Sequence, residues 1–329
     1  MHLASVVVKS RVMGQLVDGE WKVGWYAPDE RGAFARPKTQ FRSWVGAGDF
    51  AAEPGRYHLY ASYACPWAHR TMIVRSLRGL TDAIGLTIVD PKMSDDGWGF
   101  GGGGEAEPLF DAKLLRDLYV RAAPRYTGRV TVPILWDKKT NTIVNNESRE
   151  IMRMLDAPFD ELATNKTSLA PAELRAAIEA TLDAIYEPYN NGVYRAGFAA
   201  SQKAYEEACR DVFATLDRLE GVLSKQRYLC GDVFTEADVA FFTTSLRFDL
   251  VYYSHFKVNV RRLTDYPNVW GFVREVYQMP AVRPTCELAH IKEHYYWSQT
   301  TVNPHRIVPL GPTIDYDAPH DRARLGARS

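Results

Sequence analysis

The sequence predicts an α/β domain with a mixed sheet, followed by an all-helical domain. Strand and helix patterns alternate between residues 57 and 155 and include a late hairpin, which is typical of an α/β domain with helices on both faces of its sheet. From about Pro171 onward the apolar residues recur at helical spacing instead. The chain has 329 residues, 46% of them apolar, which is enough for two domains of roughly 100–200 residues each.

The period of the apolar residues predicts each element of the first half. We expect strands at residues 57–63, 84–89, 130–136 and 142–145, and helices at residues 67–80, 109–122 and 148–155. We place the two domains at residues 53–160 and 161–329. Residues 1–52 are rich in glycine, aromatic and charged residues without a sustained period, so we expect an irregular extension that packs through its tryptophan and phenylalanine side chains.

The second half contains four stretches with helical spacing, at residues 171–194, 201–226, 235–253 and 266–280. In the third stretch Thr235 can cap the backbone N–H of Asp238, whose carboxylate can reach back, and this pairing indicates a helix start. After Pro280 the chain becomes polar and aromatic. From about Gly311 it is rich in proline and arginine, so we expect a mobile tail.

Charge and composition exclude several classes of protein. Lysine plus arginine and aspartate plus glutamate each total 40 residues, so the formal net charge is zero. No long basic run is present, which argues against a nucleic-acid partner. No stretch approaches the roughly 20 apolar residues of a membrane span, and residues 1–21 lack the pattern of a secretion leader. We therefore expect a cytoplasmic protein with no nucleic-acid or membrane partner.

One cysteine stands at a position that favours chemistry. In "YASYACPWAHR", Cys65 lies between an expected strand and an expected helix, where unpaired backbone N–H groups and the helix dipole favour a thiolate. Pro66 suits the first helical position. Ala68 occupies the place of a second cysteine, so an oxidised Cys65 would need a thiol from solution to release it. The alternative is a cysteine that merely packs. The four cysteines show no CxxC or metal spacing, so we expect free thiols and no metal.

Two further motifs suit a small peptide ligand. In "RVTVPILWD", Pro133 stands at a strand start, and a cis Val132–Pro133 bond would turn the Val132 backbone outward to pair with an extended ligand. In "NNESREIM", Glu147 and Ser148 stand at a helix start, where the N–H groups and the hydroxyl can hold a carboxylate and Glu147 can take an ammonium group. A plain helix cap is the alternative for this pair. Together the motifs suit a zwitterionic thiol peptide.

These motifs, in this order and followed by "FTEADVAFF" in a helical half, resemble the cytosolic glutathione transferases. That family has a thioredoxin-like domain followed by an all-α domain. More narrowly, "GRYHLYASYACPWAHRTMIVRSL", "NNGVYRAGFA", "LRFDLVYYSHFK" and "HIKEHYYWSQTTVNPHRIVPLGP" look like the Xi class, the glutathionyl-hydroquinone reductases. The resemblance extends from about residue 41 to residue 312.

The resemblance implies a role for individual residues. Cys65 matches the nucleophile. Glutathione would be bound by Trp98, Arg129, Val132, Glu147 and Ser148, and the quinol by Tyr194, Tyr252 and Tyr295, with Tyr296 the alternative to Tyr295. The family also implies glutathione as co-substrate, an aromatic quinol substrate, and a homodimer built through the helical domains. The chain departs from the family in the glycine-rich run "GFGGGGEAEP" after Trp98 and in Gln299, which stands where we expect histidine.

The implied reaction is the glutathione-dependent reduction of a glutathionyl-hydroquinone through a Cys65–glutathione disulfide. Three alternatives stay open. An omega-like thiol transferase or dehydroascorbate reductase would use the same cysteine on other substrates. A conjugating transferase would use a serine or tyrosine near the first strand, such as Tyr60, Ser62 or Tyr63. A non-catalytic protein would bind aromatic ligands without turnover. We expect His69 and Arg70 to join the two domains and to take no part in catalysis.

Overall fold

A mixed sheet forms the core of the first domain in the computed structural model, which describes residues 14–24, 29–34 and 38–326. Its strands lie in the order β4 (Gly85–Ile88), β3 (Tyr57–Ala61), β5 (Ile134–Asp137) and β6 (Thr142–Asn145). β3 pairs in parallel with β4 and antiparallel with β5, which pairs antiparallel with β6. The expected mixed sheet with a late hairpin is confirmed.

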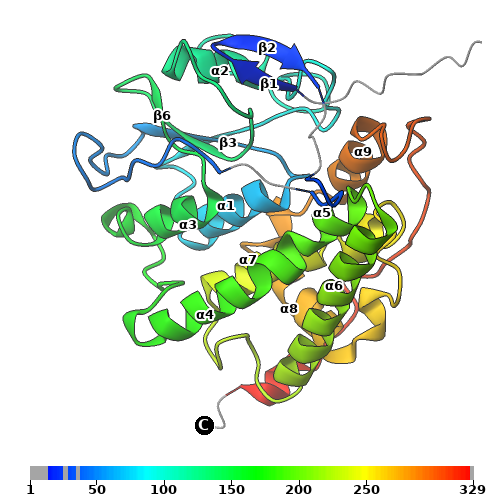
Figure 1. Cartoon of the computed structure of the whole chain (residues 1–329). Coiled ribbons are helices and arrows are strands. Elements are labelled where there is room, and N and C mark those ends of the chain that lie inside the picture. The colour runs from blue at the N-terminus through cyan, green and yellow to red at the C-terminus, as the bar shows by residue number, and fades with distance from the viewer. Residues whose placement is uncertain (1–13, 25–28, 35–37, 327–329) are drawn as a thin grey trace, which may run out of the picture.

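Helices cover both faces of this sheet (Figure 1). α1 (Pro66–Leu77) and α3 (Ser148–Asp156) pack together on the face toward the helical domain, and α2 (Leu115–Ala122) lies on the other face.

Two elements begin later than predicted. The helix expected from residue 109 begins at Leu115, because the Glu107 carboxylate accepts hydrogen bonds from the N–H groups of Leu109, Phe110 and Ala112 and holds this stretch as a loop. The strand expected from residue 130 begins at Ile134, after a cis Val132–Pro133 bond, since proline has no N–H to give to a ladder.

The extension before residue 53 is not irregular throughout, so that prediction is wrong for part of it. β1 (Gly14–Val17) and β2 (Glu20–Val23) form an antiparallel hairpin. Asp18 and Gly19 connect them with φ values of 50° and 81°, and Asp-Gly is a strong signal for this type of turn. Residues 1–13, on which most of the expectation about a leader rests, lie outside the described residues.

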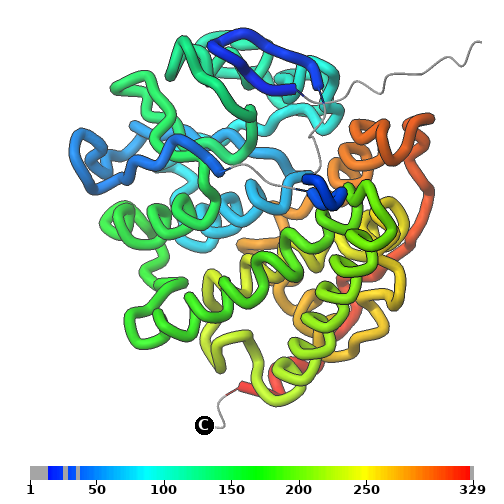
Figure 2. Tube along the Cα trace, in the orientation of Figure 1, coloured from blue at the N-terminus to red at the C-terminus, as the bar shows by residue number. Residues whose placement is uncertain are grey.

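The extension also reaches the helical domain. Figure 2 shows residues 29–34 beside α5 (Gly192–Gly197). Here the Phe34 ring lies 5.4 Å from that of Phe198, and the Ser201 hydroxyl donates to the Arg31 carbonyl. The extension therefore contacts the helical domain here and the first domain through the backbone hydrogen bonds between Leu16 and Gly128. Phe34 packs as expected, whereas Trp44 is exposed, so the expected packing holds for only part of the aromatic side chains.

The second half is helical, as predicted. Beside α5 it contains α4 (Arg175–Ile185), α6 (Gln202–Leu223), α7 (Glu236–Ser245) and α8 (Pro267–Tyr277), together with the π-helical turns η3 (Tyr186–Asn190) and η4 (Phe248–Tyr252). Short 3-10 turns lie at Asp160–Leu162, Ala172–Leu174, Leu263–Asp265, Arg283–Thr285 and Arg322–Leu325. At the start of α7 the Asp238 carboxylate accepts hydrogen bonds from the N–H and the hydroxyl of Thr235, so the predicted helix start is confirmed.

One further helix, α9 (Leu288–Ser298), was not predicted. Four of its five buried residues, Ile291, His294, Tyr295 and Ser298, follow a spacing of three, four and seven, which is the period of an amphipathic helix. This signal is present in the sequence, but apart from Ile291 it is carried by polar and aromatic side chains instead of aliphatic ones.

α1 joins the two domains. The His69 Nε2 and the Thr285 hydroxyl lie 2.9 Å apart, and the Arg70 guanidinium donates to the Ala240 carbonyl at 3.4 Å. Both side chains are buried. On α3, Arg153 forms an ion pair with the buried Glu236 of α7. His69 and Arg70 therefore lie at the domain interface, as expected.

The described part of the C-terminal tail is packed against the helical domain, contrary to our expectation of a mobile tail. The Tyr316 hydroxyl donates to the Leu246 carbonyl at 3.1 Å. Arg322 is fully buried, and its guanidinium donates to the carbonyls of three residues, Leu223, Gln226 and Arg227.

Buried histidines should make the fold sensitive to acid. Burial lowers the pKa of His58, His255 and His294 to about 4 and that of His69 well below its usual value. In the unfolded chain these histidines take up protons near pH 6.5, and the folded chain does not. The free energy of unfolding should therefore fall as the pH drops from about 6.5 to about 4, by up to ~1.4 kcal/mol per pH unit for each histidine.

Urea unfolding between pH 7.5 and 4.5 measures this slope. Asp238, whose pKa burial raises to about 6, contributes with the opposite sign. The variant His58→Gln isolates one histidine. Its free energy of unfolding should fall less steeply with decreasing pH than that of the wild type, by up to the slope that corresponds to one bound proton. Equal slopes for the two proteins would contradict the prediction.

Candidate active site

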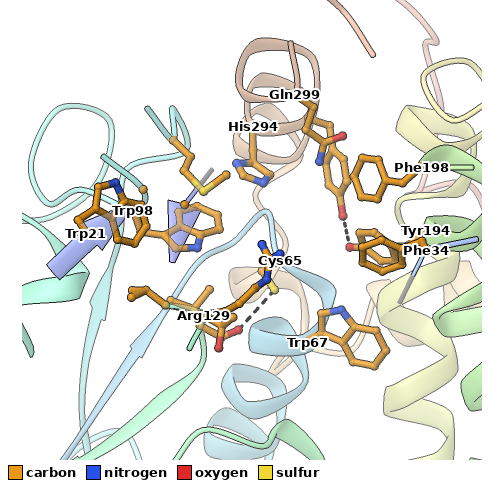
Figure 3. A pocket seen from close by; sticks show the side chains of 17 residues that line it. Trp21, Phe34, Cys65, Trp67, Trp98, Arg129, Tyr194, Phe198, His294 and Gln299 are labelled. Carbon is orange, nitrogen blue, oxygen red and sulfur yellow. Dashed lines mark hydrogen bonds between the residues drawn. The ribbon is translucent and has the colours of Figure 1, made fainter. Parts of the chain in front are cut away.

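Cys65 lies at the end of the loop between β3 and α1. It is the N-cap residue of α1, and Pro66 is the first helical residue. The side chain is partly exposed, and its Sγ lies 3.7 Å from the carbonyl oxygen of Val132. The loop that contains Pro133 therefore faces the thiol across the start of the helix (Figure 3).

Two clefts meet beside Cys65. The first, which we call the aromatic cleft, contains Cys65 and is lined by Gly14, Trp21, Phe34, Trp67, Met93, Gly97, Trp98, Arg129, Val130, Thr131, Val132, Tyr194, Phe198, His294, Tyr295 and Gln299. The second, the polar cleft, is lined by Lys38, Thr39, Arg42, Trp67, Arg129, Thr131, Val132, Pro133, Asn146, Glu147, Ser148 and Tyr186. Trp67, Arg129, Thr131 and Val132 line both, so a ligand can extend from one cleft into the other past the thiol.

The polar cleft has unused hydrogen-bonding capacity at the start of α3. Glu147 is the N-cap residue, and its carboxylate accepts hydrogen bonds from the Arg149 N–H at 3.3 Å and the Thr39 hydroxyl at 3.4 Å. The next residue, Ser148, is 3% exposed, and its hydroxyl has no partner among the described residues. A buried hydroxyl without a partner is costly, so this end of the cleft suits a polar ligand group.

Three tyrosine hydroxyls converge at the aromatic cleft. The Tyr295 hydroxyl lies 2.5 Å from that of Tyr194 and 3.1 Å from that of Tyr252; Figure 3 marks the first of these bonds. Tyr194 comes from α5, Tyr252 from η4 and Tyr295 from α9. Tyr194 and Tyr295 line the cleft, and Tyr252 is fully buried behind them.

Burial favours the protonated form of two of these phenols, Tyr252 and Tyr295, at neutral pH. It raises the pKa of Tyr252, and it raises that of Tyr295 well above the usual value. Tyr296 has different partners, since its hydroxyl contacts the Ser254 hydroxyl and the Leu250 carbonyl. The structure therefore places Tyr295, and not Tyr296, in the tyrosine cluster.

Several residues of the aromatic cleft were not predicted. The Trp98 indole, which was predicted, stacks on the His294 ring at 4.6 Å, and the His294 Nδ1 lies 2.9 Å from the Pro91 carbonyl. Burial lowers the pKa of His294 to about 4, so the ring is neutral. Trp21 and Phe34 come from the extension, where they follow no period that would have marked them as site residues.

Gln299 also lines the cleft, and its side-chain oxygen accepts a hydrogen bond from the His255 Nε2 at 2.9 Å. The glycine run after Trp98 packs against β4 and the residues that follow it. A Cβ on Gly104 would lie 2.6 Å from the Ile88 carbonyl. The glycine run is therefore accommodated by close packing, and Gln299 by its hydrogen bond to His255.

The remaining cysteines have a different environment from Cys65. Cys209, Cys230 and Cys286 are free, and none of them lines either cleft. Burial raises the pKa of all three thiols, that of Cys286 to about 12. They are therefore protonated and poor nucleophiles at neutral pH.

In the described parts of the chain no group of three or more histidine, cysteine, aspartate or glutamate side chains could hold a metal ion. Nor does any helix there have the length and apolar character needed to cross a membrane.

Comparison with known proteins gives consistent matches. The family model for the glutathione S-transferase N-terminal domain matches residues 64–157, and the model for the C-terminal domain matches residues 202–275. The glutathionyl-hydroquinone reductase YqjG of Escherichia coli is 47% identical over 94% of this chain and 98% of its own. The glutathionyl-hydroquinone reductase PcpF of Sphingobium chlorophenolicum is 48% identical over 91% and 96%.

Solved structures agree with these matches. The Xi-class glutathione transferase of Natrialba magadii is 50% identical with a TM-score of 0.90, covering 95% of this chain and 98% of its own. The glutathione-bound structure of YqjG has 45% identity and a TM-score of 0.86, with 94% and 99% covered.

Proposed function

The chain belongs to the Xi class of the glutathione transferases, the family of the glutathionyl-hydroquinone reductases, and we propose that it reduces glutathionyl-hydroquinones to hydroquinones with glutathione as the reductant. One observation carries this proposal. Cys65 lies where the polar cleft, with its unpartnered Ser148 hydroxyl, meets the aromatic cleft with its tyrosine cluster. A substrate that joins glutathione to a quinol ring through sulfur matches this arrangement.

The reaction has two steps. The Cys65 thiolate attacks the sulfur of the glutathionyl group, a sulfur–sulfur bond forms, and the bond between sulfur and the ring carbon breaks. The electron pair stays on the ring carbon, which takes a proton from the tyrosine cluster or through the ring tautomer, and the hydroquinone leaves. A second glutathione thiolate then attacks the disulfide, releasing oxidised glutathione and the Cys65 thiolate.

The polar cleft would hold the glutathione moiety. Ser148 and the N–H groups at the start of α3 would bind a carboxylate, and Glu147 an ammonium group. The Val132 backbone would pair with the peptide, because it lies outside the β5 ladder. Arg129, which lines both clefts, and Trp98 would close over the ligand. Tyr194, Tyr252 and Tyr295 would face the quinol.

Removing the Ser148 hydroxyl should weaken glutathione binding without slowing the chemistry. A hydrogen bond to a charged group contributes about 1.5–3 kcal/mol, so Ser148→Ala should raise KM for glutathione at least ~10-fold with kcat within about twofold. Steady-state kinetics measure both. Ser254→Ala is the matched control, because the Ser254 hydroxyl contacts Tyr296 away from the polar cleft. An unchanged KM in Ser148→Ala would remove Ser148 from the binding site.

A substrate panel tests the proposed reaction. Purified protein is supplied with excess glutathione and either a glutathionyl-hydroquinone, dehydroascorbate or a small disulfide, and the mass of the Cys65 peptide is measured in parallel. We expect turnover of the first substrate and a glutathione adduct on Cys65. Turnover of the other two alone would instead indicate an omega-like thiol transferase. Neither turnover nor adduct would indicate a protein that binds aromatic ligands.

The resemblance also leads us to propose a homodimer built through the helical domains, a cytoplasmic location, and domain limits near residues 53, 160 and 161. Light scattering coupled to gel filtration measures the mass of the assembly, and a monomer at micromolar concentration would contradict the first of these.

A further inference from the structure

Arg247 connects the cysteine loop to the tyrosine cluster. It is fully buried and follows the end of α7. Its Nε donates to the carbonyl of Ala64 at 2.8 Å, and its Nη2 donates to the carbonyl of Tyr63 at 2.6 Å. These are the two peptide groups directly before Cys65, although Arg247 itself belongs to the helical domain.

The backbone of the same residue starts the turn that carries Tyr252. The Arg247 carbonyl accepts hydrogen bonds from the N–H groups of Val251 at 2.9 Å and Tyr252 at 3.3 Å. One residue therefore binds the loop of the expected nucleophile through its side chain and the turn of a cluster tyrosine through its backbone.

The positive charge of Arg247 is stabilised by the dipoles of backbone carbonyl groups. No carboxylate oxygen of a described residue lies within 4 Å of its guanidinium. Its Nη1 donates to the Thr243 carbonyl and lies 3.3 Å from the His69 Nδ1. Because a buried cation without a counter-charge is costly, an anion that forms nearby is stabilised. Burial raises the pKa of Tyr252, and the Arg247 charge opposes that rise.

We propose that Arg247 is a positioning residue for the reaction. It fixes the position of the Cys65 loop relative to the Tyr252 turn, so that the thiolate and the phenol can act on the same substrate. The inference rests on the proposed function. Two features support it. The side chain of Arg247 donates hydrogen bonds to the two carbonyls before Cys65, and its backbone carbonyl accepts hydrogen bonds from the turn that carries Tyr252. Misplacing a reacting group by about 1 Å can cost on the order of 100-fold in rate, so a residue with this double contact should affect kcat.

A purely structural role predicts a different result, and the chain offers a matched control. Arg322 is also fully buried and also donates to three backbone carbonyls, those of Leu223, Gln226 and Arg227. None of these residues lines the aromatic or the polar cleft. We therefore expect Arg322→Met and Arg247→Met both to lower the melting temperature, and Arg322→Met to do so without slowing turnover.

The experiment compares Arg247→Met, Arg247→Lys and Arg322→Met in the full chain. We expect kcat for a glutathionyl-hydroquinone to fall about 30-fold in Arg247→Met and about fivefold in Arg247→Lys, because lysine keeps the charge but not the planar fork. KM for glutathione should stay within twofold. Arg322→Met should keep kcat within twofold.

A second readout needs no substrate. The rate at which iodoacetamide alkylates Cys65, followed by peptide mass against pH, should reach its midpoint at higher pH in Arg247→Met. The other charged or titratable groups around the thiol are the same in both proteins: His69 and Arg70 on α1, Arg129 before β5, Tyr194 on α5, Tyr252 on η4, and His294 and Tyr295 on α9.

The outcomes separate this inference from the proposed function. If the wild type turns over and both Arg247 variants keep kcat within twofold, or if Arg322→Met loses as much kcat as Arg247→Met, the inference is overturned. If Arg247→Met does not fold, Arg247→Lys decides alone. A loss of kcat of about threefold or more in Arg247→Lys then supports the inference, and a smaller loss overturns it. A wild type that alkylates normally but does not turn over contradicts the proposed function instead.

Discussion

Replacing Cys65 by alanine is expected to abolish the reduction of glutathionyl-hydroquinones while leaving the fold intact. The reaction needs a sulfur atom that forms a disulfide and releases it again, and the other three cysteines line neither cleft. The side chain is small and partly exposed, so its truncation removes little packing. Turnover with excess glutathione and the melting temperature measure the two halves of this prediction.

Cys65→Ser sharpens the test. A serine hydroxyl retains hydrogen bonding but cannot pass through a disulfide, so this variant should fail as a reductase as completely as the alanine variant. Conjugation of glutathione to an aryl halide is the activity to measure in it. Cys286→Ala is the control, because the raised pKa of that buried thiol predicts unchanged turnover. Residual reduction by Cys65→Ala above the uncatalysed rate would contradict the mechanism.

Removing the Tyr295 hydroxyl is expected to lower kcat about 100-fold. This hydroxyl joins those of Tyr194 and Tyr252, and proton transfer by a positioned side chain typically contributes 10²–10⁴-fold. Because burial raises the pKa of Tyr295 well above its usual value, the phenol retains its proton at neutral pH and can give it to the ring carbon. Tyr295→Phe keeps the ring and its packing, so KM should change little.

Tyr296→Phe is the control for this substitution. Tyr296 is the next residue of the same helix, and its hydroxyl contacts Ser254 instead of the cluster. It should therefore keep kcat within about twofold. A loss in Tyr296→Phe as large as that in Tyr295→Phe would show that helix packing, and not the cluster hydroxyl, limits the rate. Equal activity of the wild type, Tyr295→Phe and Tyr296→Phe would indicate that the ring carbon obtains its proton through the ring tautomer and not from Tyr295.

Much of the fold follows from local signals. The strand before Cys65, the helix after it and the capping pair of Thr235 and Asp238 depend on residues close together in sequence, so their pattern can be read directly. The start of α2 could not be read in this way. The Glu107 carboxylate keeps the N–H groups of Leu109, Phe110 and Ala112 out of the helix. That carboxylate also accepts a hydrogen bond from the hydroxyl of Tyr60 in β3, which lies 47 residues away in sequence.

The sequence by itself determined the two-part architecture and the helix-start position of Cys65. The resemblance to a known family identified glutathione and a quinol as the candidate bound molecules. Only the tertiary structure decided which tyrosine joins the cluster, that Trp21 and Phe34 of the extension line the cleft, and that Arg247 holds the loop of Cys65. The physical reason is distance along the chain. Period and capping arise from neighbours within about one helical turn, whereas these contacts join residues far apart in sequence, from both domains and the extension, which only packing brings together.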